Sequence, residues 1–243
     1  MSVSRETVLE VVSRFDVPEP DRTADAVLRL LAALEAEPDP PTTVRTPAAA
    51  LDVHVADSLS GLAVPALRAA AHIADIGAGA GFPGVVLAAA LPEAQVDLIE
   101  AAQRKCVVIG RLASAAGIEA RAQAIPSRAE DWARSNRGAY DAVTARALAP
   151  LAVICEYAAP LLREGGALVA WKGARDAEEE AMGAAAASQL GFAAAEILPV
   201  TPFQGSRNLH LHVYSKVSDT PPTVPRRVGM ATKKPLGSRG DKR

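Results

Sequence analysis

The chain has 243 residues, 49% of them hydrophobic, and its formal net charge is −2. This length suits one medium-sized α/β domain with a helical extension. Two cysteines exclude a disulfide framework, no apolar run approaches the ~18 residues of a membrane span, and residues 1–30 carry too many charges for a secretory signal, so we expect a soluble cytoplasmic protein.

The N-terminal part of the chain is predicted to be helical. Residues 4–36 place apolar side chains at helical spacing, and the stretch Glu-Pro-Asp-Pro-Pro at 37–41 breaks the chain. Thr46 is a favourable N-cap, and Pro47 suits the first turn of a helix. We therefore expect a helical extension over residues 1–70.

Strands and helices alternate over residues 71–217, which predicts a mostly parallel sheet. Seven segments have strand character: 72–76, 95–100, 118–125, 140–145, 166–172, 192–200 and 207–216. Five have helical character: 82–91, 103–116, 127–134, 148–162 and 175–190. No helix separates the last two strands, so we expect an antiparallel hairpin at one sheet edge. The fold class is α/β, with a Rossmann-like, seven-stranded sheet.

A glycine-rich loop follows the first predicted strand and reads DIGAGAGFPG from Asp75 to Gly84. Gly77, Gly79 and Gly81 allow a sharp turn and a close approach of the backbone to a ligand. In open α/β sheets, ligands bind outside the carboxyl ends of the strands. The loop therefore predicts a cofactor site.

Two cofactors fit this loop, because it also contains the dinucleotide pattern G-x-G-x-x-G. Three features favour S-adenosylmethionine. The Asp75 carboxylate could reach the amino group of a methionine moiety, Pro83 removes an N–H that a pyrophosphate would need, and the edge hairpin resembles the class I methyltransferase sheet. Glu100, at the end of the second strand, is expected to accept hydrogen bonds from ribose hydroxyls of either cofactor.

The basic residues concentrate at the C-terminus. Residues 221–243 hold seven basic residues and one acid, a net charge of +6, which leaves −8 on the rest of the chain. This asymmetry fits a polyanionic partner, or a tail that only aids solubility, and we expect residues 218–243 to form a basic, flexible C-terminal tail. The four histidines do not cluster with cysteines at ligand spacing, so we expect no metal site.

Short motifs occur in order along the chain at the ends of successive predicted elements. They are His54–Leu59 (HVADSL), Asp75–Gly84, Ser127–Glu130 (SRAE), Thr144–Ala147 (TARA), Trp171–Gly173 (WKG), Pro225–Met230 (PRRVGM) and Lys233–Leu236 (KKPL). This series resembles the RsmG (GidB) family, bacterial enzymes that methylate N7 of one guanine in the 530 loop of 16S ribosomal RNA. The resemblance covers roughly residues 45–236.

The resemblance implies a class I methyltransferase fold, S-adenosylmethionine as cofactor, and 16S ribosomal RNA or the 30S subunit as partner. Together with the glycine loop, it gives these expected cofactor contacts: Asp75, Gly77, Gly79, Gly81, Phe82, Glu100, Ala129, Glu130 and Arg146. The expected RNA contacts are His54, Asp57, Ser58, Lys172, Arg207, Arg226, Arg227, Lys233 and Lys234.

Arg146 is the candidate catalytic residue. It could donate to guanine O6 or a phosphate and so orient the base, it could contact the cofactor carboxylate, or it could form only a structural salt bridge. Guanine N7 carries a lone pair and no proton, so its methylation needs no general base. That fits a sequence in which no nucleophile–base set stands out beside the loop.

Two departures from the family pattern are visible. The usual tryptophan–asparagine–leucine–threonine stretch is replaced by Thr42–Thr46 (TTVRT), and Glu100 stands where aspartate is common. A small-molecule methyltransferase and a nicotinamide-dependent oxidoreductase stay open as alternative functions. The oligomeric state is not predicted.

Overall fold

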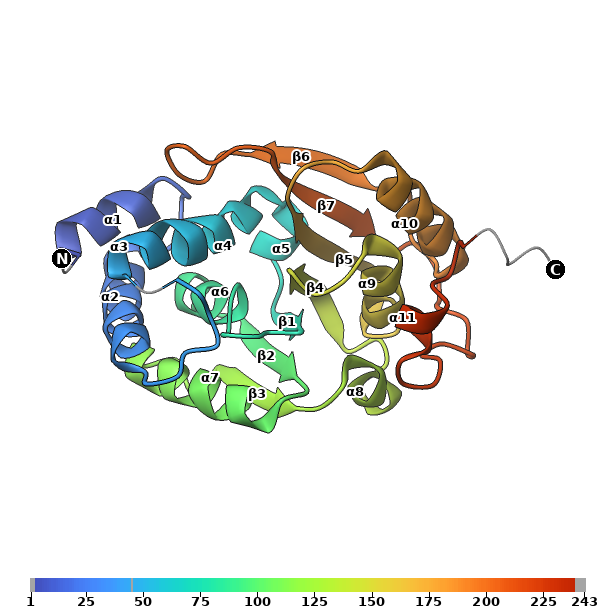
Figure 1. Cartoon of the computed structure of the whole chain (residues 1–243), viewed down its shortest axis with the longest axis horizontal. Helices are drawn as coiled ribbons and strands as arrows, with labels where there is room; N and C mark the ends of the chain where they lie inside the picture. The colour runs from blue at the N-terminus through green and yellow to red at the C-terminus, as the bar shows by residue number, and fades with distance from the viewer. Residues whose placement is uncertain (1–2, 45, 239–243) are drawn as a thin grey trace.

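The computed structural model describes residues 3–44 and 46–238. Its centre is a seven-stranded sheet of order β3-β2-β1-β4-β5-β7-β6. The strands are β1 His72–Ile76, β2 Gln95–Glu100, β3 Ala122–Pro126, β4 Tyr140–Arg146, β5 Leu162–Lys172, β6 Glu196–Val200 and β7 Leu209–Ser215. Strands β1 to β5 pair in parallel, and β7 is antiparallel to both β5 and β6. The expected Rossmann-like sheet and its edge hairpin are confirmed (Figure 1).

Helices cover both faces of the sheet and continue into the N-terminal extension (Figure 1). The longer helices are α1 Arg5–Ser13, α2 Pro20–Ala36, α6 Gly84–Ala90, α7 Gln103–Ala116, α8 Ala129–Ser135, α9 Leu151–Ala158 and α10 Ala177–Gln189. The shorter ones are α3 Pro47–Ala50, α4 Asp57–Leu59, α5 Pro65–Arg68 and α11 Met230–Lys233, with a π-helical turn at Leu51–Ala56 and a 3₁₀ turn at Ser60–Ala63. No helix among the described residues is long and apolar enough to cross a membrane.

Several element boundaries differ from the predicted ones, and three of the differences have a clear local cause. The helical region 4–36 is split into α1 and α2 at Asp16, whose φ of 56° is incompatible with a continuous helix. Strand β3 begins four residues late, because Gly117 ends α7 in a left-handed conformation and the Ile118 N–H is spent on the Ala113 carbonyl. Helix α9 is shorter than 148–162, because residues 147–150 form a loop and β5 already begins at Leu162.

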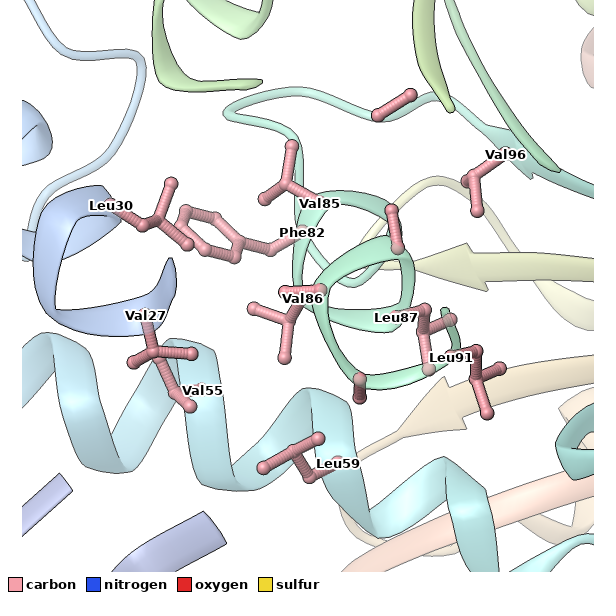
Figure 2. Packing of buried hydrophobic residues seen from close by; sticks show 14 of the residues in the cluster. Val27, Leu30, Val55, Leu59, Phe82, Val85, Val86, Leu87, Leu91 and Val96 are labelled. Atoms are coloured by element: carbon pink, nitrogen blue, oxygen red, sulfur yellow. The ribbon is translucent and has the colours of Figure 1, made fainter. Parts of the chain in front are cut away.

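The extension and the sheet share one hydrophobic core. Figure 2 shows α6 beside both α2 and the helical segment 51–59, with Val27, Leu30, Val55 and Leu59 near its apolar side chains. A second cluster fills the opposite face of the sheet, under α8, α9 and α10. Because the extension is part of the main core, its helices are held in fixed positions beside the glycine loop.

The segment expected to be a flexible tail contacts the domain over its described part. Val224 and Ala231 are buried there, and α11 packs against α9 (Figure 1). Residues 239–243 lie outside the described residues.

Candidate active site

The glycine loop turns at the carboxyl end of β1. The N–H groups of Gly77 and Ala78 both donate to the carbonyl of Ile99, at the end of β2 (2.8 and 3.2 Å). Gly77 and Gly79 have φ values of +66° and +61°, which side chains other than glycine rarely adopt. A Cβ on Gly77 would lie 2.4 Å from Leu148 Cδ1, whereas one on Gly79 would meet only the Gly77 carbonyl oxygen, at 3.8 Å. The loop therefore presents bare backbone toward a cavity.

Asp75 lies behind the loop and not on the cavity. Its side chain is 1% exposed, and its Oδ2 accepts a hydrogen bond from the Gly84 N–H at 3.0 Å. Its Oδ1 accepts from the Thr144 hydroxyl on β4 at 2.9 Å. The expectation that this carboxylate reaches the methionine amino group is therefore wrong in geometry. Asp75 instead ties the start of α6 to two strands.

Burial makes Asp75 sensitive to pH. It raises the pKa of this carboxyl from 3.8 to about 6, although the hydrogen bonds from Thr144 and Gly84 oppose the shift. The folded chain then binds a proton more tightly than the unfolded chain. Its stability is therefore greatest below pH 4 as far as this group is concerned, and falls as the pH rises toward 6.

The variant Asp75→Asn should remove this pH dependence, because its amide can serve both partners without a charge. The free energy of unfolding of the variant minus that of the unmodified chain should rise by about 3 kcal/mol between pH 4 and pH 6.5 and then level off. Urea unfolding across this range measures it. Asp141→Asn gives the contrast: burial raises the pKa of Asp141, but hydrogen bonds from Arg163, His72 and Ala71 outweigh it and lower the pKa. The free energy of unfolding of Asp141→Asn minus that of the unmodified chain should fall with rising pH mainly below about pH 4 and stay nearly flat from pH 4 to pH 6.5. A rise parallel to that of Asp75→Asn would contradict the assignment.

Glu100 at the end of β2 braces the glycine loop. Its two carboxylate oxygens accept the N–H groups of Gly79 (3.0 Å) and Ala102 (2.8 Å), and Lys105 Nζ lies 4.0 Å away. Each carboxylate oxygen can accept a further hydrogen bond. Glu100 lines the cavity, so the expected contacts to ribose hydroxyls are geometrically feasible.

A stacked pair forms another wall of the cavity. The His54 ring lies over the Phe82 ring, with centroids 4.4 Å apart and planes 10° from parallel. Phe82 itself is buried and lies near Leu30 of α2 in Figure 2. The pair therefore joins the glycine loop to the extension at the cavity.

Arg146, at the end of β4, binds the same part of the extension. Its Nη1 donates to the Val53 carbonyl and to Asp57 Oδ2, both at 2.9 Å, and its Nη2 donates to His54 Nδ1 at 3.1 Å. Among the described residues these bonds leave the Nε–H and one Nη2–H without a partner. The predicted salt bridge exists, and donors remain for a substrate or a cofactor.

The protonation of His54 follows from these contacts. Burial and then the Arg146 charge lower its pKa to about 4, so the ring is neutral near pH 7. Its Nδ1 accepts from Arg146, so the proton is on Nε2, which donates to Thr42 Oγ1 at 2.9 Å. Both nitrogens are engaged, and His54 is a fixed part of the wall.

These residues surround a cavity of about 610 Å³ at the carboxyl ends of β1, β2 and β4, within the size range of small-molecule sites. Eight of the predicted site residues line it: His54, Gly77, Gly79, Phe82, Glu100, Ala129, Glu130 and Arg146. Four further polar lining residues lie outside the family motifs and were not predicted: Thr42, Lys105, Tyr157 and Thr232. Thr42 stands within a region flagged only as a departure, and the other three carry no local signal.

Comparison with known proteins decides the family. The sequence pattern described as "rRNA small subunit methyltransferase G" matches residues 41–209. Ribosomal RNA small subunit methyltransferase G of Rubrobacter xylanophilus is 39% identical over 201 residues, covering 81% of this chain and 77% of its own. The protein of the same name from Symbiobacterium thermophilum is 37% identical over 205 residues, covering 80% and 82%. The chain belongs to the rRNA small subunit methyltransferase G family.

Solved structures agree at the level of the fold. A SAM-dependent O-methyltransferase from Thermotoga maritima superposes with a TM-score of 0.55 at 15% identity, covering 78% of this chain and 71% of its own. The cofactor-bound protein Rv0187 from MTB superposes with a TM-score of 0.55 at 20% identity, covering 79% and 90%. Membership of the methyltransferase G family sets aside the oxidoreductase and small-molecule alternatives.

The cofactor of this methyltransferase is S-adenosylmethionine, and the cavity suits it. Gly79 lines the cavity without a side chain and so admits a ligand against the backbone, and Glu100 offers carboxylate oxygens for hydroxyl groups. Ala129, Glu130 and Tyr157 also line the cavity. Gly81 packs toward Val85 and does not line the cavity, so a direct cofactor contact of Gly81 is not supported.

The predicted RNA contacts are scattered. Ser58 is fully buried and donates to the His54 carbonyl, so its position does not suit an RNA contact. Asp57 pairs with Arg146 and does not line the cavity. Lys172 forms a 2.6 Å salt bridge with Glu179 of α10, which orders the β5 end. Arg207 is exposed in the β6–β7 loop.

The four basic residues near the C-terminus differ among themselves. Arg227, Lys233 and Lys234 are exposed, whereas Arg226 forms a salt bridge with the buried Glu156.

Proposed function

We propose that this enzyme transfers a methyl group to N7 of a specific guanine in the 530 loop of 16S ribosomal RNA, in the cytoplasm. The observation that carries the choice of acceptor atom is the state of the acid–base groups around the cavity. His54, Glu100, Glu130 and Tyr157 line it and each is hydrogen-bonded to the protein, while Lys105 Nζ lies 4.0 Å from Glu100.

This arrangement suits an acceptor that has no proton to lose. Guanine N7 attacks with an in-plane lone pair, so the new bond forms without a general base. An exocyclic amine or a hydroxyl would release a proton during methylation. When bound, S-adenosylmethionine supplies an activated methyl group, and the protein's contribution is positioning and the exclusion of water.

Arg146 has a defined part in that positioning. Its contacts with Val53 and Asp57 fix the guanidinium at the cavity, where its remaining N–H groups can donate to guanine O6 or a phosphate. A cationic arginine stacked on the guanine face would repel the positive charge that the ring gains on N7 methylation and so slow the reaction. We therefore assign Arg146 an in-plane, orienting role.

Basic side chains stand around the mouth of the cavity and support an RNA partner. Lys105 and Arg128 line it directly, and Lys233 and Lys234 follow Thr232, which also lines it. Such contacts to phosphates provide affinity that does not depend on sequence. Specific recognition of one guanine requires an exposed base and depends on the shape of the RNA.

The test is to map N7-methylguanine in 16S RNA. Small subunits from cells that lack the enzyme should acquire the modification at one guanine of the 530 loop when purified enzyme and S-adenosylmethionine are added. Chemical cleavage at N7-methylguanine followed by primer extension locates it. Naked 16S RNA, tested in parallel, distinguishes RNA from the assembled 30S subunit as substrate. Methylation of an amino group or a hydroxyl instead would reject the proposal.

A further inference from the structure

The C-terminal strap, residues 218–238, lies outside the region matched by the family pattern, which ends at residue 209. It is nonetheless firmly attached to the domain. Arg226 makes two hydrogen bonds to the carboxylate of Glu156 on α9, at 2.7 and 2.5 Å, and Glu156 is only 2% exposed. Arg137 adds hydrogen bonds to the strap carbonyls of Thr220 and Val224. In Figure 1 the strap passes from the end of the sheet to α11, beside α9.

The strap reaches the cofactor cavity at two points. Thr232 on α11 lines the cavity, and its hydroxyl lies 3.3 Å from that of Tyr157, which also lines it. The Gly229 N–H donates to Glu130 Oε1 at 3.0 Å. Glu130 is 5% exposed, and it too lines the cavity. The strap therefore supplies one wall residue directly and holds a second one in place.

We propose that the C-terminal strap is part of the S-adenosylmethionine site, with Arg226 as the positioning residue that keeps it docked. An undocked strap would remove Thr232 from the wall and release Glu130. Since the strap would favour the bound cofactor, the bound cofactor must equally favour the docked strap. The proposal concerns the cofactor cavity and does not depend on which RNA atom is methylated.

The latch is the Arg226–Glu156 pair. Without the Arg226 guanidinium, the buried Glu156 carboxylate would lose this partner charge, and an uncompensated charge is costly in a low-dielectric interior. Undocking the strap would let water reach Glu156, so loss of Arg226 shifts the strap toward the undocked state. Arg227 is exposed, and the structure shows no salt bridge from it to any described residue. It offers a matched control on the same segment.

Undocking of the strap can be measured by proteolysis at a residue of the strap itself. Lys233 is exposed on α11, so trypsin cleavage after it measures how often the strap leaves the domain. In the unmodified full-length chain, saturating S-adenosylhomocysteine should slow this cleavage at least about fivefold, as reciprocal coupling requires.

The decisive measurement is the Kd of S-adenosylhomocysteine by calorimetry, with no RNA present. Arg226→Ala should weaken binding about tenfold or more and speed cleavage after Lys233, whereas Arg227→Ala should leave Kd within about twofold. Arg226→Lys, which keeps a cation near Glu156, should restore part of the affinity. A general loss of structure would not be rescued in this way.

A second variant keeps the proposal testable if Arg226→Ala does not fold. Gly229 has a φ of +78°, and a Cβ there would meet open space. Gly229→Pro removes the N–H that binds Glu130 and cannot adopt that φ, yet it leaves the buried Arg226–Glu156 pair intact. It should weaken binding of S-adenosylhomocysteine by a similar factor. An unchanged Kd of S-adenosylhomocysteine in both Arg226→Ala and Gly229→Pro would overturn the proposal. So would a rate of cleavage after Lys233 that is the same with and without S-adenosylhomocysteine.

These readouts are separate from the acceptor assignment. If N7-methylguanine does not form while the coupling between strap and cofactor is observed, only the proposed function fails. If N7-methylguanine forms but the Kd of S-adenosylhomocysteine does not change in the strap variants, only the strap proposal fails.

Discussion

Arg146→Ala should lower kcat/KM for methylation of the small subunit by roughly a hundredfold to a thousandfold, the cost of losing a positioned charged donor at a reacting group. The side chain is 16% exposed and links β4 to Val53, His54 and Asp57. Its removal frees the stacked His54 as well as the orienting donors. Incorporation of a tritiated methyl group under limiting substrate measures the effect.

Two further observations separate the roles of Arg146. If its free N–H groups orient guanine, the Kd of S-adenosylhomocysteine should stay nearly unchanged in Arg146→Ala. If they hold the cofactor carboxylate, that Kd should rise with the loss of rate. Arg163→Ala is a matched control, because Arg163 also pairs with an aspartate, Asp141, but its side chain is 54% exposed and does not line the cavity. Normal turnover and normal cofactor affinity in Arg146→Ala would refute both roles.

Gly79→Ala is expected to weaken S-adenosylhomocysteine binding by roughly a hundredfold, while the fold survives. Gly79 lines the cavity and a Cβ there would touch no protein atom closer than the Gly77 carbonyl oxygen at 3.8 Å, so the added methyl group would take space where the cofactor has to approach the backbone. The substitution also strains a residue with φ +61°, which costs about 1 kcal/mol of stability by itself. Calorimetry with S-adenosylhomocysteine, combined with thermal unfolding, separates the two effects.

Gly138→Ala provides the control for strain. Gly138 has a φ of +64°, a Cβ there would meet open space, and it lies before β4 and does not line the cavity. Both variants should lose similar stability, but only Gly79→Ala should lose cofactor affinity. Equal cofactor affinity in the two would mean that the space before Gly79 is not used by the cofactor.

The sheet and the glycine loop could be predicted because their signals are local. The alternation of strand and helix, and glycines that follow directly after β1, are visible in any short window of the sequence. The family motifs then added Arg146, Ala129 and Glu130, which do line the cavity.

The orientation of side chains could not be predicted in the same way. Asp75 has the right position in the sequence for a cofactor contact, but its carboxylate turns toward Thr144, 69 residues away. His54 meets Arg146 across 92 residues, a contact that only the folded chain creates. Thr42 enters the site through His54, so no pattern around Thr42 itself could have indicated it.

The C-terminal strap shows a different limit of prediction from sequence. Its basic composition suggested a flexible tail, because composition averages over a segment and its few buried anchors are lost in the average. Val224, Arg226 and Ala231 are spread along it, and their partners belong to other elements. Packing at such isolated points is visible only once α9 and α8 are in place.

The contact between Asp75 and Gly84 limits how this loop can diverge. A Cβ on Gly84 would lie 2.8 Å from Asp75 Oδ2 and 2.8 Å from Leu98 Cδ2, so no larger residue fits while both neighbours keep their present side chains. A substitution at 84 would have to follow changes at positions 75 and 98, each of which first loosens the start of α6. Substitution of Gly84 alone is therefore expected to be disfavoured, and a larger residue at this position is expected only together with changes at positions 75 and 98.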